Sequence, residues 1–315
     1  MDRNDVDWNG YWIATTTPFK RDGSLDEAAL RQGLRSYPGM GIRGVLVNGT
    51  SGEWFSQTSA ERRRVAQIAV EELRGNIPVV IGCTTFTAAH TGELAQHAEK
   101  IGADGVMSTP PPYCVPTPRE VICYFQGLSE YVDTPIMVYN WARGTNVEIK
   151  YDTSVELSKI ENVVAIKDST TDRDQMIKTL EHVSDKVRIF APLISRLGLA
   201  VIRGIGGDGN IDGCPTAASF GSDFYESVSR GDDERAKAAA DRYVAMMSRL
   251  INPDWSGVYG TAQAQYKACM NIMGQPGGYP RLPLLPIEDP KSLTALQEIL
   301  TSAGLLEPTV RAKAV

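Results

Sequence analysis

The stretch Val163-Val164-Ala165-Ile166-Lys167-Asp168 is an apolar run of strand type, and a segment of helical period over Thr171–Val183 follows it. The same alternation of short apolar runs and longer helical segments continues from the N-terminus to residue 230. Repeated units of this kind are typical of a parallel sheet. Eight strands are predicted in this way, at Trp12–Thr16, Gly44–Asn48, Pro78–Gly82, Gly105–Ser108, Pro135–Tyr139, Val163–Ile166, Val187–Phe190 and Gly209–Ile211.

Eight strands that alternate with helices predict an α/β fold, a closed (β/α)8 TIM barrel. The rival architecture, a doubly wound open sheet, usually carries a glycine-rich fingerprint after its first strand. Here that turn reads Thr15-Thr16-Thr17-Pro18-Phe19, and the literal match at Gly204–Gly209 follows a helix and precedes a strand. We therefore expect a barrel domain over residues 1–230 and a C-terminal helical domain over residues 231–315, where helices follow without intervening strands.

The composition and charge of the chain argue against several classes of function. The chain has 315 residues, 42% hydrophobic content and a net charge of −6, and its charges are interspersed. This pattern gives no basic stripe for nucleic acid, and no apolar run is long enough to span a membrane. The N-terminus is polar rather than signal-like, so a cytoplasmic location is expected. Five cysteines without a C-x-x-C pair and three scattered histidines give no reason to expect a metal site.

The most informative single residue is Lys167, which closes an apolar strand. In a (β/α)8 barrel the active site lies at the carboxyl ends of the strands. Burial there would lower the pKa of the lysine, and the neutral amine can attack a ketone to form a Schiff base. The alternative is that the strand simply ends and Lys167 points into water.

Two further strand ends are expected to lie near Lys167. Strand two is followed by Gly49-Thr50-Ser51-Gly52-Glu53, whose backbone N–H groups and hydroxyls suit a carboxylate, although an ordinary turn has the same composition. Strand five ends in Tyr139, next to strand six, and its phenol could pair with the lysine in proton transfer. A tyrosine that merely packs in the barrel mouth is the alternative.

Several short motifs occur together and in order. They are Thr16-Thr17-Pro18-Phe19, Gly49-Thr50-Ser51-Gly52-Glu53, Thr109-Pro110-Pro111-Pro112-Tyr113, Tyr139-Asn140, Ala165-Ile166-Lys167-Asp168 and Arg281-Leu282-Pro283-Leu284-Leu285-Pro286. In this order and spacing the chain resembles the dihydrodipicolinate synthase and N-acetylneuraminate lyase superfamily. The resemblance covers nearly the whole chain.

The resemblance implies roles for several residues. Lys167 would carry pyruvate, or a 2-keto acid that yields it, as a covalent Schiff base, so that no cofactor is needed. Tyr139 would shuttle protons, while Thr50 and Ser51 would hold the keto-acid carboxylate and relay protons. Tyr113 would enter the active site of a neighbouring subunit, which implies at least a dimer and, as is common in the family, a homotetramer built from two dimers. A proline-stiffened turn with a packed tyrosine is the alternative for Tyr113.

Other positions bear on the second substrate. Arg143 could clamp a second carboxylate, although the arginine of true synthases lies one position later and an exposed loop arginine is equally compatible. Ile211 and Asp212, at the end of strand eight, are expected to contact the substrate. The segment Gly209-Asn210-Ile211-Asp212-Gly213 departs from the usual family sequence. These departures favour a specialised keto-acid lyase.

The resulting hypothesis is a Schiff-base-forming aldolase or lyase that acts on pyruvate and an aldehyde. Two alternatives within the same lysine chemistry stay open. One is a dehydratase or deaminase of a sugar acid or a hydroxyproline-derived keto acid, and the other is a 4-hydroxy-tetrahydrodipicolinate synthase. A sensor that only binds a keto acid would need neither Lys167 nor Tyr139. The sequence does not identify the second substrate or the direction of the reaction.

Overall fold

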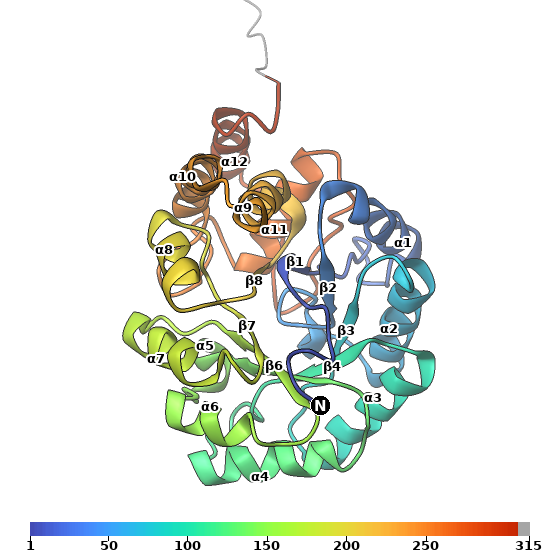
Figure 1. Ribbon diagram of the computed structural model, residues 1–315. Helices are drawn as coiled ribbons and strands as arrows, with labels where there is room; N and C mark the ends of the chain where they lie inside the picture. Colours follow the sequence, from blue (N-terminus) through green and yellow to red (C-terminus); the bar gives the residue numbers. More distant parts are fainter. Residues whose placement is uncertain (308–315) are drawn as a thin grey trace, which may run out of the picture.

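The computed structural model describes residues 1–307, and the predicted closed barrel is confirmed. Eight parallel strands follow one another around the barrel in chain order, and β8 pairs with β1. Figure 1 shows the helices as a ring around these strands, with α9, α10, α11 and α12 gathered on one side. The strands are β1 (Gly10–Ala14), β2 (Gly44–Val47), β3 (Val79–Gly82), β4 (Gly105–Ser108), β5 (Ile136–Asn140), β6 (Val163–Asp168), β7 (Arg188–Phe190) and β8 (Gly209–Asp212).

Several of the helices between the strands begin at a residue whose side chain caps the first turn. Thr58 and Glu61 form a reciprocal capping box at the start of α2, and the Asp172 side chain accepts hydrogen bonds from the first turn of α7. The helices are α1 (Glu27–Ser36), α2 (Ser59–Leu73), α3 (Ala88–Ile101), α4 (Pro118–Ser129), α5 (Ala142–Thr145), α6 (Tyr151–Leu157), α7 (Arg173–Val183), α8 (Arg196–Gly204), α9 (Ala218–Arg230), α10 (Asp233–Leu250), α11 (Ala262–Ile272) and α12 (Pro290–Ser302), with short 3-10 turns at Pro38–Met40, Trp54–Ser56 and Pro215–Ala217.

The bounds of the first strand differ from the predicted ones. Strand one is predicted over Trp12–Thr16, whereas β1 covers Gly10–Ala14. Pairing with β8 begins at Gly10, and the chain leaves the sheet after Thr15, whose N–H still donates to Leu46 O at 2.9 Å. The bounds of β1 are therefore set by hydrogen bonding to the neighbouring strands and not by the strand propensity of its residues.

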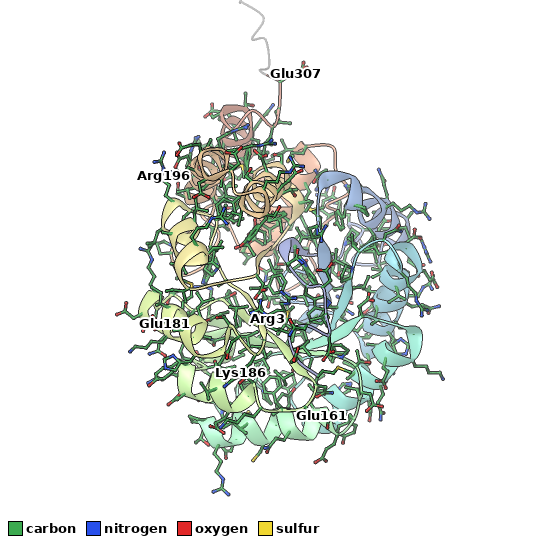
Figure 2. The ribbon with its side chains drawn as sticks, viewed as in Figure 1. Arg3, Glu161, Glu181, Lys186, Arg196 and Glu307 are labelled. Atoms are coloured by element: carbon green, nitrogen blue, oxygen red, sulfur yellow. The ribbon has the colours of Figure 1, made fainter. Side chains whose placement is uncertain are left out.

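The core has two layers because side chains alternate across each strand. Trp12 and Phe190 fill the barrel interior, with ring centroids 5.0 Å apart. Tyr11 and Ile13, the alternating residues of β1, belong to the second layer between strands and helices. Charged side chains such as Glu181 and Arg196 lie on the outer edge of the helix ring (Figure 2).

The strands β7 and β8 pair through a single register position, Phe190 with Gly209. Beyond it the chain after β7 turns away through Ala191–Ser195 into α8. Backbone hydrogen bonds from the Asp208 N–H to Ile189 O at 2.8 Å and from the Ala191 N–H to Gly209 O at 3.0 Å flank this pair, on the side where α8 packs against α10.

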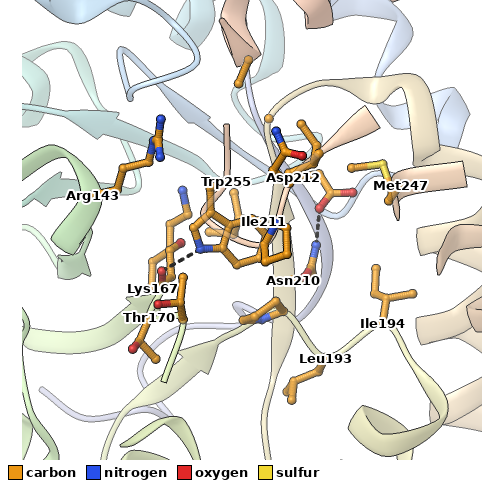
Figure 3. A pocket seen from close by; sticks show the side chains of 18 of the residues that line it. Arg143, Lys167, Thr170, Leu193, Ile194, Asn210, Ile211, Asp212, Met247 and Trp255 are labelled. Atoms are coloured by element: carbon orange, nitrogen blue, oxygen red, sulfur yellow. Dashed lines mark hydrogen bonds between the residues drawn. The ribbon is translucent and has the colours of Figure 1, made fainter. Parts of the chain in front are cut away.

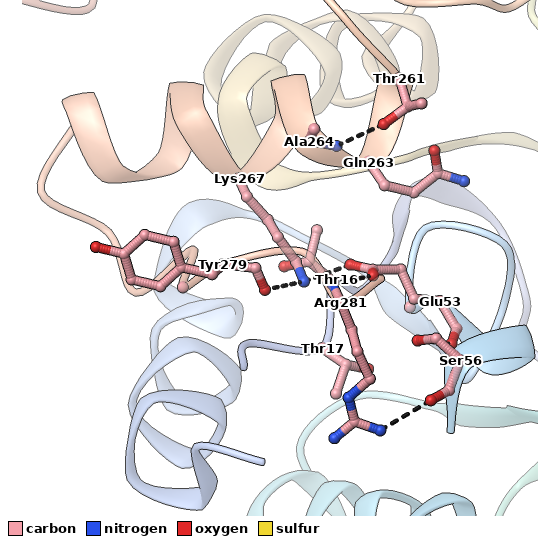
Figure 4. A network of polar contacts seen from close by, with 12 residues as sticks. Thr16, Thr17, Glu53, Ser56, Thr261, Gln263, Ala264, Lys267, Tyr279 and Arg281 are labelled. Atoms are coloured by element: carbon pink, nitrogen blue, oxygen red, sulfur yellow. Dashed lines mark hydrogen bonds and ion pairs between the residues drawn. The ribbon is translucent and has the colours of Figure 1, made fainter. Parts of the chain in front are cut away.

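A buried ion pair connects the C-terminal helices to the barrel. Lys267 on α11 bonds to Glu53, which follows β2, and the side chains are 1% and 0% exposed. The Lys267 amine also donates to Tyr279 O at 2.8 Å, and the Arg281 backbone N–H donates to Glu53 Oε2 at 2.9 Å (Figure 4). Burial lowers the pKa of Lys267 to about 8, and Glu53 opposes this shift. The division of the chain at residues 230 and 231 stays a prediction, and residues 308–315 lie outside the described residues.

Replacing Lys267 by methionine is expected to lower the free energy of unfolding by about 3–5 kcal/mol, because Glu53 would stay buried without its cation. Denaturant titration measures this loss. The matched control is Arg21→Met, which removes one partner of the exposed Arg21–Glu288 pair and should change the stability little. Equal effects of the two substitutions would show that the buried pair has no special role in holding the helices to the barrel.

Candidate active site

The carboxyl ends of β5 and β6 bring Tyr139 and Lys167 together. The two residues are paired in the register of the strands, and the Lys167 Nζ lies 3.9 Å from the centroid of the Tyr139 ring. Both residues are buried, with Lys167 7% exposed and Tyr139 3% exposed. The alternative that Lys167 points into solvent is therefore wrong.

Burial controls the protonation of both groups. It lowers the pKa of Lys167 to about 7, and the acidic side chain of Asp212 opposes this shift. Burial also raises the pKa of Tyr139 well above its ordinary value, while hydrogen bonds with the side chains of Ser169 and Thr50 act in the opposite direction. At neutral pH an appreciable fraction of Lys167 is a free amine, and Tyr139 keeps its proton.

The register of the two strands is supported by a buried polar network just beside the lysine. Asn140 donates to Asp168 Oδ1 at 2.9 Å and accepts from the Ile149 N–H at 3.0 Å. The same Asp168 oxygen accepts from the Thr170 N–H at 3.0 Å, and burial raises the pKa of Asp168 to about 6. These bonds connect the chain on both sides of Lys167 and restrict the position of its backbone.

A cavity of about 780 Å³ opens above these residues. Of the predicted site residues, it is lined by Lys167, Tyr139, Thr50, Ser51, Arg143, Ile211 and Asp212. Figure 3 shows Arg143 and Lys167 on one side of β8 and the apolar residues Leu193, Ile194 and Met247 on the other. Strands 2, 5, 6 and 8 thus contribute to one space, as the carboxyl ends of barrel strands do.

Two predicted site residues lie in surroundings that the sequence did not indicate. Arg143 forms an ion pair with Asp254 and donates to the Asp254 carbonyl at 3.0 Å, at the exposed rim of the cavity. Tyr113 is 89% exposed, with a backbone φ of 78°, and is not among the residues that line the cavity of its own chain.

From residues 1–307, Asp212 receives three hydrogen bonds and no direct bond from a cation. The hydroxyls of Tyr11 and Tyr243 donate at 2.8 and 2.7 Å, and Asn210 Nδ2 donates at 2.6 Å. Burial raises the pKa of Asp212, and these three bonds oppose the shift. Asp212 thus brings an acidic group to the wall of the cavity.

Sequence reasoning missed the segment that covers the site. Trp255 follows α10, lines the cavity and donates from Nε1 to Ser169 O at 3.0 Å, although the two residues are far apart in the chain. Its backbone φ of 67° is in the left-handed region, where a bulky residue is rare. Trp141 stacks on Tyr139 with ring centroids 5.8 Å apart. No motif marked either tryptophan, because their roles depend on contacts made only in the folded chain.

Within the described residues, no three histidine, cysteine or acidic side chains are placed to hold a metal ion. No helix in this part of the chain combines the length and the apolar character needed to cross a bilayer. The polar side chains that line the cavity include an amine, hydroxyls and a carboxyl group.

Comparisons with known proteins agree on one family. The model of the dihydrodipicolinate synthetase family matches residues 7–303. A DapA-like lyase of Rhizobium meliloti is 33% identical, with 90% of this chain and 92% of the relative covered. A 4-hydroxy-tetrahydrodipicolinate synthase of Methylobacterium radiotolerans is 30% identical over 94% of this chain and 96% of the relative. The crystal structure of a dihydrodipicolinate synthase from Thermotoga maritima superposes with a TM-score of 0.86 at 28% identity and covers 96% of this chain and all of that one.

Proposed function

Because the chain belongs to the dihydrodipicolinate synthetase family and is thus an enzyme of the aldolase-type lyases, we propose that it forms a Schiff base between Lys167 and pyruvate. The observation that carries this proposal is the buried amine, 3.9 Å from the centroid of the Tyr139 ring at the mouth of the barrel. The substrate is pyruvate itself or a 2-keto acid that yields pyruvate on cleavage.

The proposed chemistry begins with attack of the neutral Lys167 amine on the keto carbon. The resulting carbinolamine loses its oxygen as water and leaves a protonated imine, which withdraws electrons from the neighbouring carbon. In the direction of synthesis, that carbon then loses a proton to give an enamine. In the direction of cleavage, the bond between that carbon and the second substrate breaks. Tyr139 supplies and accepts the protons, which pass to solvent through the hydroxyls of Thr50 and Ser51.

The keto-acid carboxylate is proposed to lie against Thr50 and Ser51. Both follow β2 and line the cavity at the carboxyl end of that strand. Ile211 forms the adjoining wall, and Arg143 holds the covering segment through Asp254. We further propose a homodimer or a tetramer of two dimers, because the exposed ring of Tyr113 is free to enter a partner's site. Sedimentation of the active enzyme tests this assembly.

A synthase of 4-hydroxy-tetrahydrodipicolinate remains the second candidate function, since the Methylobacterium radiotolerans relative carries that name. A dehydratase or deaminase that uses the same imine would consume its keto acid without an aldehyde. A panel of 2-keto acids, assayed with and without aldehydes, separates these three activities.

Borohydride trapping tests the proposed function. Reduction in the presence of pyruvate should inactivate the enzyme and add the mass of one reduced pyruvate to the peptide that contains Lys167. Reduction without pyruvate is the control and should leave both the mass and the activity unchanged. Labelling spread over exposed lysines such as Lys186, with activity retained, would exclude an imine mechanism.

The rate of imine formation should depend on pH through Lys167. Its pKa is lowered to about 7, so the nucleophilic amine is scarce below that pH and abundant above it. We expect the rate at subsaturating pyruvate to rise between about pH 6 and pH 8 and then to level off. Inactivation by borohydride at a series of pH values measures this profile. A rate that continued to climb to about pH 10 would mean that the amine has its ordinary pKa.

A further inference from the structure

The cavity extends well past the groups that the pyruvate imine needs. Beyond β8 it continues into an apolar chamber, which we define by six of its lining residues, Leu193, Ile194, Leu197, Val244, Met247 and Ile251. Leu197 and Val244 are exposed, so the chamber opens to solvent on their side. They come from the loop after β7, from α8, from α10 and from the residue that follows α10. A cavity of about 780 Å³ is in the range that holds a drug-sized ligand, and pyruvate is far smaller.

The chamber lies beyond the short seam between β7 and β8. Phe190 pairs with Gly209 and the Ala191 N–H donates to Gly209 O at 3.0 Å, and the chain after β7 then leaves β8 and continues into α8. Met247 borders the cavity near Asn210 and Asp212, while Leu193 and Ile194 are buried in the wall behind it (Figure 3). The imine site and the apolar chamber thus form one continuous cavity.

The charges along the cavity disfavour a second carboxylate. Among the described residues, four charged side chains line it, and three of them are basic. Lys167 is consumed by the imine, Arg143 is bonded to Asp254, and Arg173 lies exposed on the rim at the start of α7. The fourth, Asp212, is an acidic group next to the chamber, already supplied with three neutral donors. Within the described part of the chain, an anionic substituent there would find no buried cation to pair with.

We infer that the second substrate is an uncharged aldehyde with a bulky aromatic substituent, which the apolar chamber takes up while its carbonyl carbon faces Lys167. This inference rests on the proposed imine. Trp141 and Trp255 add flat aromatic walls to the same cavity, which suit an aromatic ring. Burial of the ring in the chamber provides the binding energy that a carboxylate clamp would otherwise provide.

The bond-forming step balances with these groups alone. The enamine carbon of the lysine-bound pyruvate attacks the aldehyde carbon, and the carbonyl π electrons move to the aldehyde oxygen. This oxygen takes a proton and becomes a hydroxyl, while the enamine returns to the imine. Water then hydrolyses the imine, frees the Lys167 amine and releases a 4-hydroxy-2-keto acid. Cleavage is the same sequence in reverse.

A substrate panel on the intact enzyme tests this inference. We expect kcat/KM with pyruvate to be at least about tenfold higher for benzaldehyde than for succinic semialdehyde, which carries a carboxylate. A preference for the carboxylated aldehyde, or turnover with neither, would overturn the inference. Borohydride trapping with pyruvate alone separates the two proposals: an adduct without aromatic turnover would leave the imine standing, and the absence of an adduct would overturn both.

Filling the chamber gives an independent test. The substitution Met247→Trp places a large side chain in it and should lower kcat/KM for benzaldehyde at least about tenfold more than for acetaldehyde. The matched control is Leu285→Trp, which adds the same ring at an exposed position outside the cavity and should leave the ratio unchanged. If Met247→Trp lowers both aldehydes equally, the aromatic ring does not bind in the chamber.

Discussion

Lys167→Ala is expected to remove pyruvate-dependent turnover, lowering kcat by at least about 10⁴-fold, because the atom that bonds the substrate is lost. Steady-state assays at saturating pyruvate measure this effect. The matched control is Lys186→Ala, which removes an exposed lysine and should retain full activity. Substantial turnover by Lys167→Ala would mean that the reaction does not pass through an imine at this residue.

The loss should be chemical, because the variant is expected to fold. The pKa of Lys167 is lowered from 10.5 to about 7, so the folded protein binds this proton less tightly than the unfolded chain. The lysine therefore destabilises the fold below about pH 7, and this effect fades as the pH rises towards 10.5. Removing the amine relieves the cost at low pH. Thermal unfolding of Lys167→Ala at several pH values checks that its inactivity does not come from misfolding.

Tyr139→Phe is expected to lower kcat by about 10²–10⁴-fold while KM for pyruvate changes little. The ring, its stacking on Trp141 and its contact with Lys167 are kept, and only the hydroxyl between Ser169 and Thr50 is lost. The measurement is a split of kcat from KM, together with the rate of imine trapping.

Tyr124→Phe is the matched control for this change. Tyr124 is also a buried tyrosine, with hydroxyl contacts to Ser108 at 2.8 Å and Thr91 at 3.0 Å, but it does not line the cavity. It should lose stability without losing kcat. Similar kcat values for Tyr139→Phe and the wild type would remove the Tyr139 hydroxyl from the mechanism.

The sequence predicted the barrel and the meeting of Lys167 with Tyr139 because both depend on regular features. Apolar runs give the strands, and chain order around a (β/α)8 barrel makes strands five and six neighbours. The end of β1 was misplaced because its pairing stops at Ala14 with β2 and at Ile13 with β8, and no local feature of the sequence indicates where pairing stops.

Contacts between segments that are far apart in the chain could not be predicted from the sequence. No local feature of the sequence indicates that Trp255 donates a hydrogen bond to Ser169, or that Asp254 forms an ion pair with Arg143. The apolar chamber lies beyond the short seam between β7 and β8, whose extent the composition of Val187–Phe190 does not reveal. The roles of Arg143, Ile211 and Asp212 stay predictions, and that of Tyr113 depends on a second copy of the chain.

The most direct test of the central claim is a crystal structure of the enzyme reacted with pyruvate and borohydride. The account predicts continuous electron density from Lys167 Nζ to the former keto carbon, with the Tyr139 hydroxyl beside the new bond and the carboxylate against Thr50 and Ser51. Pyruvate bound without a covalent bond to Lys167, or attached to another lysine, would contradict it.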